Sequence, residues 1–224
     1  MCFLLVIGIC IQLKTIESTG SVSKSLSDNA LRDEVLKWKE RYDNAYRELQ
    51  QAENRLENER KKASTSDEET VKMEEELHKI NVLLGLTDVV GRGVVVTVDD
   101  SKLESSQILD ANSAVVHDGD LVEIVNILKN GGAEAVSINN QRIINTTAIT
   151  CDGTVVRING EKIGVPFVIN AIGPTEGLKG SLEMKNNYVS QMIEDGVEVK
   201  IVKSNKVEIP KYNGVIESEY MKDR

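Results

Sequence analysis

Hydrophobic and polar positions divide the chain into unlike stretches. An apolar run, MCFLLVIGICIQL, occupies residues 1–13, and a polar stretch follows over residues 14–29. Residues 30–84 contain neither glycine nor proline, and their apolar positions recur at alternating spacings of four and three. Glycine-separated β-branched runs begin only at Gly91. This order predicts a membrane-anchor segment, a linker, a helical stalk and then an α/β head domain over residues 85–224.

The stalk carries the seam of a coiled coil, in which apolar residues fill the a and d positions of each heptad. In its first part these positions are Leu31, Val35, Trp38, Tyr42, Ala45, Leu49, Ala52 and Leu56. The polar run at residues 64–67 interrupts the pattern, and a second helix is predicted from about Glu68 to Leu84. Since a lone helix cannot bury its seam, the pattern favours a parallel homodimer. A single solvated helix is the alternative.

The head begins with a strand–helix–strand unit. The β-branched run at residues 91–100 has apolar residues on both faces, which is typical of a central strand. Asp120, with Glu123 three residues later, forms a capping pattern that predicts the start of a helix. Gly131 ends this helix, and residues 133–139 form the next strand. A unit of this length predicts one parallel crossover.

Two dipeptides mark the middle of the head. Asp152-Gly153 and Asn159-Gly160 separate β-rich runs, which is the pattern of two-residue hairpin turns. We therefore predict a three-stranded meander over residues 145–172, then helical segments to about Asp195 and a last strand. With the meander as an insertion, the order is β-α-β-β-α-β. That order predicts an α+β, ferredoxin-like head with both helices on one face of an antiparallel sheet.

Charge and cysteine content restrict the function. The net charge of −9 argues against a nucleic-acid partner, because nucleic-acid binders normally carry a basic face. Cys2, Cys10 and Cys151 include no CxxC pair, so a zinc ribbon is excluded and no disulfide framework is expected. We expect Cys151 to pack at a strand end, with a reactive thiol as the alternative.

The apolar run at residues 2–13 is shorter than the roughly 20 residues that a membrane-spanning helix needs. We interpret it as a transmembrane helix whose first turns and basic flank are missing from this translation start. A signal-peptide remnant and a buried core helix are the alternatives.

No pattern indicates a catalytic site, a metal centre or a cofactor. Serine nucleophile elbows, HExxH and a phosphate-binding loop are all absent from the sequence. The run His117-Asp118-Gly119-Asp120, with Asp99 and Asp100 upstream, has the side chains for a metal site. Helix capping by Asp120 and turn formation at Asp118-Gly119 explain the same residues, so no metal is expected.

A polar quartet follows the second predicted strand of the head. Asn139, Asn140, Gln141 and Arg142, together with Arg92, form the candidate partner or ligand surface. Arg142 can bind a carboxylate through its fork of donors. The alternative is that the quartet satisfies buried backbone groups and holds the crossover to the meander.

Three strings carry a resemblance to a known family: GRGVVVTVDD, VVHDGDLVEIVNILKNGGAEAVSINNQRI and TAITCDGTVVRINGEKIGVPFVINAIG. They resemble the YlxW/YlxX-like family, bacterial envelope proteins of unknown function that are often labelled division initiation proteins. The resemblance covers about residues 31–210, including the stalk. It implies a bacterial, mostly Gram-positive setting and a head outside the cytoplasmic membrane. It supplies no catalytic residues.

Together these observations predict a non-enzymatic protein, anchored by a single pass in the bacterial cytoplasmic membrane. Its coiled coil is expected to form a homodimer, and its extracytoplasmic head to bind a protein partner in cell division or cell-wall assembly. A small-ligand sensor is the first alternative, by analogy with other ferredoxin-like domains. A metal-dependent hydrolase that uses the Asp/His group is the second.

Overall fold

The computed structural model describes residues 32–56, 58–60, 68–103, 112–216 and 220. The expected anchor segment and linker lie outside the described residues. The chain divides into two compact units between Lys72 and Met73. Within the part of the chain that the structure describes, no helix is both long enough and apolar enough to cross a bilayer.

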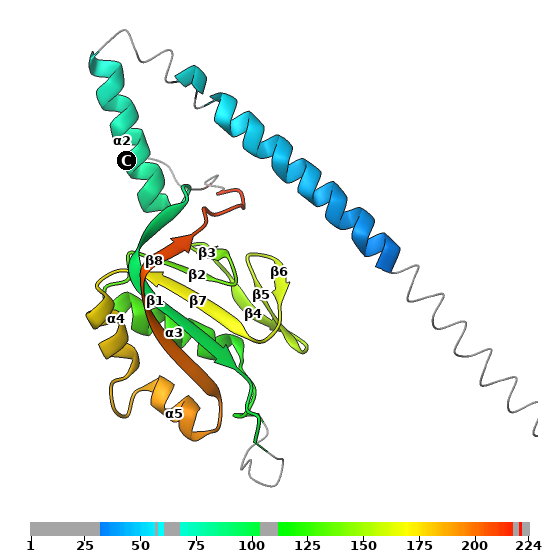
Figure 1. The fold of residues 1–224 in the computed structure, drawn as a ribbon, viewed down its shortest axis with the longest axis vertical. Coiled ribbons are helices and arrows are strands. Elements are labelled where there is room, and N and C mark those ends of the chain that lie inside the picture. Colours follow the sequence, from blue (N-terminus) through cyan, green and yellow to red (C-terminus); the bar gives the residue numbers. More distant parts are fainter. Residues whose placement is uncertain (1–31, 57, 61–67, 104–111, 217–219, 221–224) are drawn as a thin grey trace, which may run out of the picture. The chain divides into compact units, whose positions relative to one another are not determined.

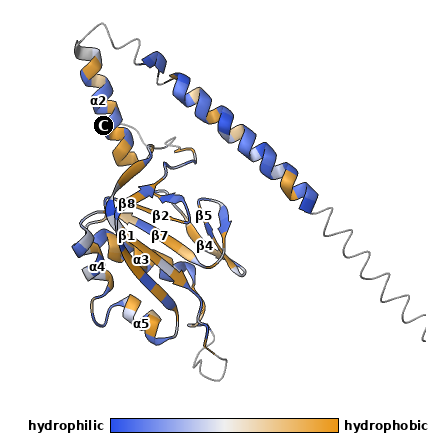
Figure 2. Cartoon of the chain, viewed as in Figure 1, coloured by the Kyte–Doolittle hydropathy of each residue, from blue (hydrophilic) through white to orange (hydrophobic). Residues whose placement is uncertain are grey.

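The first unit is represented by a helix over residues 32–56 and 58–60 (Figure 1). Two contacts within this helix are local: Tyr42 and Tyr46 stack with ring centroids 6.3 Å apart, and the Arg41 guanidinium lies 5.1 Å from the Trp38 ring centroid. Isolated apolar positions lie within an otherwise hydrophilic helix (Figure 2). In the single chain the seam is therefore open to solvent, with Val35, Trp38, Leu49 and Leu56 between 49% and 61% exposed.

The second unit contains the sheets and the remaining helices, and α2 runs across the division between the units. The elements are, in chain order, α2 (Glu68–Leu84), β1 (Val89–Asp99), α3 (Asp118–Asn130), β2 (Ala135–Ile138), β3 (Gln141–Ile143), β4 (Ile149–Asp152), β5 (Val155–Ile158), β6 (Glu161–Ile163), β7 (Phe167–Ile172), α4 (Thr175–Leu182), α5 (Tyr188–Glu194) and β8 (Glu198–Ile209). The sequence expectation placed α2 with the stalk, whereas the division leaves most of it with the sheets.

The main sheet has the strand order β3-β2-β7-β1-β8, and every pair of neighbouring strands is antiparallel. β1 lies between β7 and β8, as expected for a β-branched run with apolar residues on both faces. Strands β4, β5 and β6 form a separate antiparallel sheet. The protein is therefore an α+β structure with antiparallel sheets, preceded by a long helix.

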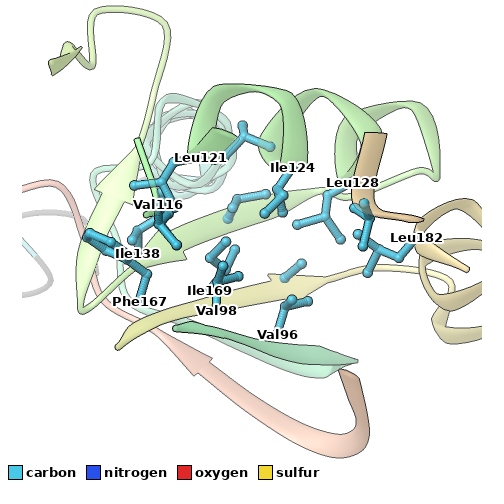
Figure 3. Packing of buried hydrophobic residues seen from close by; sticks show 14 of the residues in the cluster. Val96, Val98, Val116, Leu121, Ile124, Leu128, Ile138, Phe167, Ile169 and Leu182 are labelled. Atoms are coloured by element: carbon cyan, nitrogen blue, oxygen red, sulfur yellow. The ribbon is translucent and has the colours of Figure 1, made fainter. Parts of the chain in front are cut away.

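The main core lies between the sheet and helices α3, α4 and α5 (Figure 3). Leu121, Ile124 and Leu128 form the apolar stripe of α3 and are fully buried. Figure 3 shows these side chains directed toward Ile169 and Val98 of the sheet. Burial of each such side chain stabilises the fold by about 1.5–3 kcal/mol.

A bulge in β1 lets the strand pass very close to β7. The register between β1 and β8 shifts between Gly91 and Gly93. A Cβ atom at Gly93 would lie 1.9 Å from the carbonyl oxygen of Ala171, so only glycine fits at this position. Beyond the bulge, a second small cluster forms around Ile172, Val207 and Ile209.

The structure confirms one hairpin turn of the middle region, moves the other by one residue and corrects two strands. β5 and β6 pair through a turn at Asn159-Gly160, as predicted, whereas β4 and β5 pair through Gly153-Thr154, because Asp152 still belongs to β4 and pairs with Val155. The third run of the meander is not one strand. It breaks before Pro166, which has no N–H to donate, and β7 then joins the main sheet. The segment after Asn140, expected to be a strand end, is the short strand β3.

Candidate functional site

A cavity of about 430 Å³ lies where the loop before α3, the first turn of α3 and helix α5 meet. Val115, Met192 and Val197 contribute apolar surface to its lining, and Asp118, Asp120 and Asp195 contribute carboxylates. The first turn of α3 contains the His-Asp-Gly-Asp run of the sequence, so this cavity includes residues that sequence reasoning considered for chemistry.

Asp120 joins three parts of this cavity wall. Its Oδ2 accepts a hydrogen bond from the backbone N–H of His117 at 2.6 Å, so Asp120 is the third residue of a capping box in which His117 is the N-cap. The sequence expectation, in which Asp120 opened the helix with Glu123 as its partner, was wrong by three residues. The Oδ1 atom of Asp120 accepts a hydrogen bond from the Tyr188 hydroxyl at 2.6 Å, which ties α5 to α3. This bond to a carboxylate, with burial, raises the pKa of Tyr188 to about 12. Tyr188 therefore keeps its proton throughout the physiological range.

Asp118 and Cys151 connect α3 to strand β4. The Cys151 N–H donates to Asp118 Oδ2 at 3.0 Å, and the Asp118 N–H donates to Cys151 Sγ at 3.4 Å. Interaction with the Cys151 side chain, followed by the hydrogen bond from the Cys151 N–H, holds the pKa of Asp118 below its ordinary value. The Asp118 N–H acts to lower the pKa of Cys151, but burial and the Asp118 and Asp120 carboxylates raise it above its ordinary value overall.

His117 lies beside the thiol. Its Nδ1 is 3.8 Å from Cys151 Sγ, and its Nε2 is 3.1 Å from the carbonyl oxygen of Asn112. A thiol, an imidazole and a group that orients the imidazole are the parts of an activated cysteine nucleophile. Because the pKa of Cys151 is raised, however, the protonated thiol predominates at neutral pH, and thiolate chemistry is disfavoured. Cys151 is exposed and hydrogen-bonded, which corrects the expectation of a packed strand end.

Asp99 and Asp100 organise the backbone beside this site. Asp100 Oδ1 accepts the N–H of Val116 at 2.8 Å, and Asp99 Oδ1 accepts the N–H of Asp100 at 3.0 Å. Among the residues that the structure describes, no group of three or more His, Cys, Asp or Glu side chains is placed to hold a metal ion.

The predicted polar quartet forms a hairpin turn and a buried contact. Asn139 and Asn140 have positive φ values of 44° and 66° and connect β2 to β3. The Asn139 amide donates to the Pro166 carbonyl at 3.2 Å and accepts the Val168 N–H at 2.7 Å, which fixes the turn against β7. Asparagine tolerates this left-handed backbone better than most residues.

Arg142 is only 5% exposed, whereas the sequence expectation treated it as a donor to a partner. Its Nη1 donates to the carbonyl oxygens of Thr87 and Pro210, each at 3.3 Å. Burial lowers the pKa of the guanidinium, opposed by the nearby Asp88 carboxylate. This geometry agrees with the alternative stated for the quartet in the sequence analysis, in which its side chains satisfy buried backbone groups.

The remaining predicted surface residues do not gather into one site. Gln141 Oε1 accepts from Asn159 Nδ2 at 3.4 Å, which links β3 to the small sheet. Arg92 is exposed at the β1 bulge, where its carbonyl oxygen accepts the Gly173 N–H at 3.0 Å. Arg92 thus lies beside the end of β7, whereas Asn139 contacts the beginning of β7.

Sequence reasoning missed Tyr188, Gln191 and Asp195, which line the cavity from α5 and its C-terminal end. Asn187, the N-cap of α5, accepts the Ser190 N–H at 2.8 Å and so fixes where this short helix begins. The capping residue Asn187 can be recognised in the sequence, but Tyr188 and its partner Asp120 are 68 residues apart in the chain. No local pattern brings them together.

Comparison with known proteins gives consistent matches. The profile of a family described as "Bacterial protein of unknown function (DUF881)" matches residues 76–222. The UPF0749 protein YlxW of Bacillus subtilis (strain 168) is 29% identical over 194 residues, which cover 86% of this chain and 83% of that protein. The UPF0749 protein Rv1823 of Mycobacterium tuberculosis (strain ATCC 25618 / H37Rv) is 32% identical over 97 residues, which cover 41% of this chain and 32% of that protein.

One solved structure is similar in fold. It is the crystal structure of an uncharacterized conserved protein from Mycobacterium tuberculosis, with a TM-score of 0.54 and 19% sequence identity. The match covers 66% of this chain and 99% of that chain. At this identity the likeness concerns the fold alone.

Proposed function

We propose a function from the premise that this chain belongs to the DUF881 family of bacterial proteins of unknown function. The protein is a non-enzymatic envelope protein. It self-associates through its long helix and binds a protein partner through its sheet domain. The observation that carries the proposal is the exposed seam of that helix. Leu49 and Leu56, at successive a positions, are 49% and 53% exposed in the single chain. Pairing with a second copy removes this apolar surface from water.

Sedimentation of the full chain tests the self-association. A species heavier than a monomer is expected at micromolar concentration. Replacing both Leu49 and Leu56 with lysine should return the protein to a monomer, because it places charges in the seam. The matched control replaces Gln51 and Asn54 with lysine, which adds the same charge away from the seam. A parent chain that stays monomeric, or equal effects of the two double variants, would contradict the proposal.

The envelope location has separate support. The apolar residues 2–13 and the polar stretch after them suit a segment anchored in the cytoplasmic membrane, with the sheet domain on its outer side. The resemblance to YlxW/YlxX-like envelope proteins supports the same placement. Protease added to intact protoplasts should then digest the sheet domain. Protection of that domain would contradict the placement.

The link to cell division or cell-wall assembly is supported only by the label that the YlxW/YlxX-like family often carries. Crosslinking in growing cells, with the full chain as bait, should capture an envelope protein of that machinery in a one-to-one proportion that survives stringent washing. Capture that also occurs with an unrelated membrane-anchored coiled coil would argue against a specific partner.

A second candidate function is the binding of a small ligand, and the cavity between α3 and α5 favours it. A concave site with apolar walls and a few polar groups is a typical ligand site. We further infer that the domain is ferredoxin-like. The strand order β2-β7-β1-β8 with antiparallel neighbours supports this, with β3 added at one edge and the β4-β5-β6 sheet inserted between β3 and β7.

A further inference from the structure

We infer, building on the second candidate function, that the cavity between α3 and α5 binds a protonated amine or guanidinium group carried on an aliphatic stem. Tyr188, Gln191 and Asp195 each offer a hydrogen-bond acceptor on this cavity, its aspartates give it a negative formal charge, and Val115, Met192 and Val197 give it apolar surface. A donor-rich cation with a methylene chain matches all of these properties.

The available acceptors come from α5 and its C-terminal end. The Tyr188 hydroxyl donates a hydrogen bond to Asp120, so its oxygen remains able to accept a hydrogen bond from a ligand. The Gln191 amide and the Asp195 carboxylate also line the cavity, and neither side chain has a hydrogen bond or ion pair among the described residues. An ammonium or guanidinium supplies several donors to such a set.

The charges around the cavity favour a cation. Asp118, Asp120 and Asp195 line it, and no lysine or arginine does so among the residues described. Carboxylates around a concave site concentrate negative potential there. The overall net charge of −9 acts in the same direction.

Helix N-termini carry partial positive charge and attract anions, but the N-terminus of α3 does not offer such a site. Its amide groups are already used. The Asp118 N–H donates to Cys151 Sγ, and the Gly119 N–H donates to Asp118 Oδ1 at 2.9 Å. Asp120 caps the same turn with a carboxylate. The helix terminus is therefore neutralised by groups of the protein itself.

The apolar part of the lining explains why the cation needs a stem. Met192 and Val197 are 5% and 3% exposed, and Val115 adds a further apolar side chain. Methylene groups of a long cationic side chain or ligand pack well on such a surface while the charged end stays among polar groups. The cavity volume of about 430 Å³ lies within the range of roughly 300–1,000 Å³ that is usual for ligand sites.

Calorimetric titration of the full chain with n-butylguanidinium and with its neutral analogue n-butylurea tests the inference. Saturable binding is expected for n-butylguanidinium alone, and added salt should weaken it. Replacing Asp195 with asparagine should weaken the binding about tenfold, since a charge-assisted hydrogen bond is lost. The control variant, Glu161→Gln, removes an exposed carboxylate on β6 outside the cavity and should leave the binding unchanged.

A gain-of-affinity variant guards against misfolding as an explanation. Gln191→Glu adds a carboxylate at an exposed position of the lining and should strengthen the binding severalfold, whereas Gln191→Lys should abolish it. Titration with the peptide acetyl-Gly-Gly-Arg-Gly-Gly-amide, beside its glutamine analogue, distinguishes the two sources of the cation. Binding of n-butylguanidinium alone supports a free small cation, and binding of the arginine peptide as well supports a basic side chain.

Absence of saturable binding for both n-butylguanidinium and the arginine peptide would overturn the inference, and so would equal binding of n-butylurea. Either result would leave self-association intact, because sedimentation measures that property independently.

Discussion

Cys151 and Asp118 hold each other through two hydrogen bonds that run in opposite directions, one from the Cys151 N–H to Asp118 Oδ2 at 3.0 Å and one from the Asp118 N–H to Cys151 Sγ at 3.4 Å. The two residues are 33 positions apart in the chain. Their contact attaches the small β4-β5-β6 sheet to the first turn of α3. It therefore fixes one side of the candidate cavity.

Replacing Asp118 with alanine should loosen this attachment. The Cys151 N–H loses its acceptor, so its hydrogen exchange should become faster, and the free energy of unfolding should fall by about 0.5–1.5 kcal/mol. Exchange measured by mass spectrometry and a urea titration check the two effects. Glu161→Ala, at an exposed site of the same sheet, is the control and should change neither. Unchanged exchange at Cys151 in the Asp118 variant would show that the bond does not hold the strand.

The same contact should depend on pH. The pKa of Asp118 lies below its ordinary value of 3.8, so the unfolded chain takes up a proton at this residue more readily than the folded protein does. The stabilisation is therefore present above pH 3.8 and is lost as the pH falls through the lowered folded value. Urea titrations of the parent chain and of Asp118→Asn should differ near neutral pH and converge in acid. A difference that persists unchanged in acid would contradict this assignment.

Tyr188 should titrate unusually late. Its hydrogen bond to Asp120 raises its pKa to about 12, so the stabilisation is complete below the ordinary tyrosine value near 10 and is lost as the pH rises through about 12. The absorbance difference between the parent chain and Tyr188→Phe, followed against pH, isolates this one phenol. Asp120→Asn should move the transition toward lower pH, because the asparagine carries no charge. A difference spectrum that titrates near pH 10 in the parent would disprove the bond.

Local signals in the sequence were sufficient for part of this fold. Asn159-Gly160 places one turn of the small sheet, and Asp152-Gly153 places the other to within one residue, because the positive φ values at Gly153, Asn159 and Gly160 depend on the turn residues themselves. Asp120 likewise locates the first turn of α3, although the helix begins at Asp118 and His117 is its N-cap. The heptad spacing predicted the first helix because it, too, is a pattern of residues close together in the chain.

The candidate site could not be read in this way, because its contacts join distant segments. Arg142 reaches carbonyl oxygens of Thr87 and Pro210, which are 55 and 68 residues away. In the sequence, Arg142 stands beside other polar residues. That pattern fits an exposed binding residue as well as a buried arginine that donates to backbone carbonyl oxygens. The cavity also depends on where α5 docks, and no periodicity in a seven-residue helix specifies that.

Arg142 provides the sharpest test of whether its segment is scaffold or surface. Replacement by alanine leaves the Thr87 and Pro210 carbonyls without their donor and removes the buried packing of the side chain, so the free energy of unfolding should fall by about 1–3 kcal/mol. Arg142→Lys should recover part of the loss, because an ammonium on a flexible stem does not reproduce the planar fork. Arg92→Ala, at the exposed β1 bulge, is the matched control and should stay within about 0.5 kcal/mol of the parent. Equal stability of the two alanine variants in urea titrations would show that Arg142 is not a structural clamp, and would return it to the candidate binding surface.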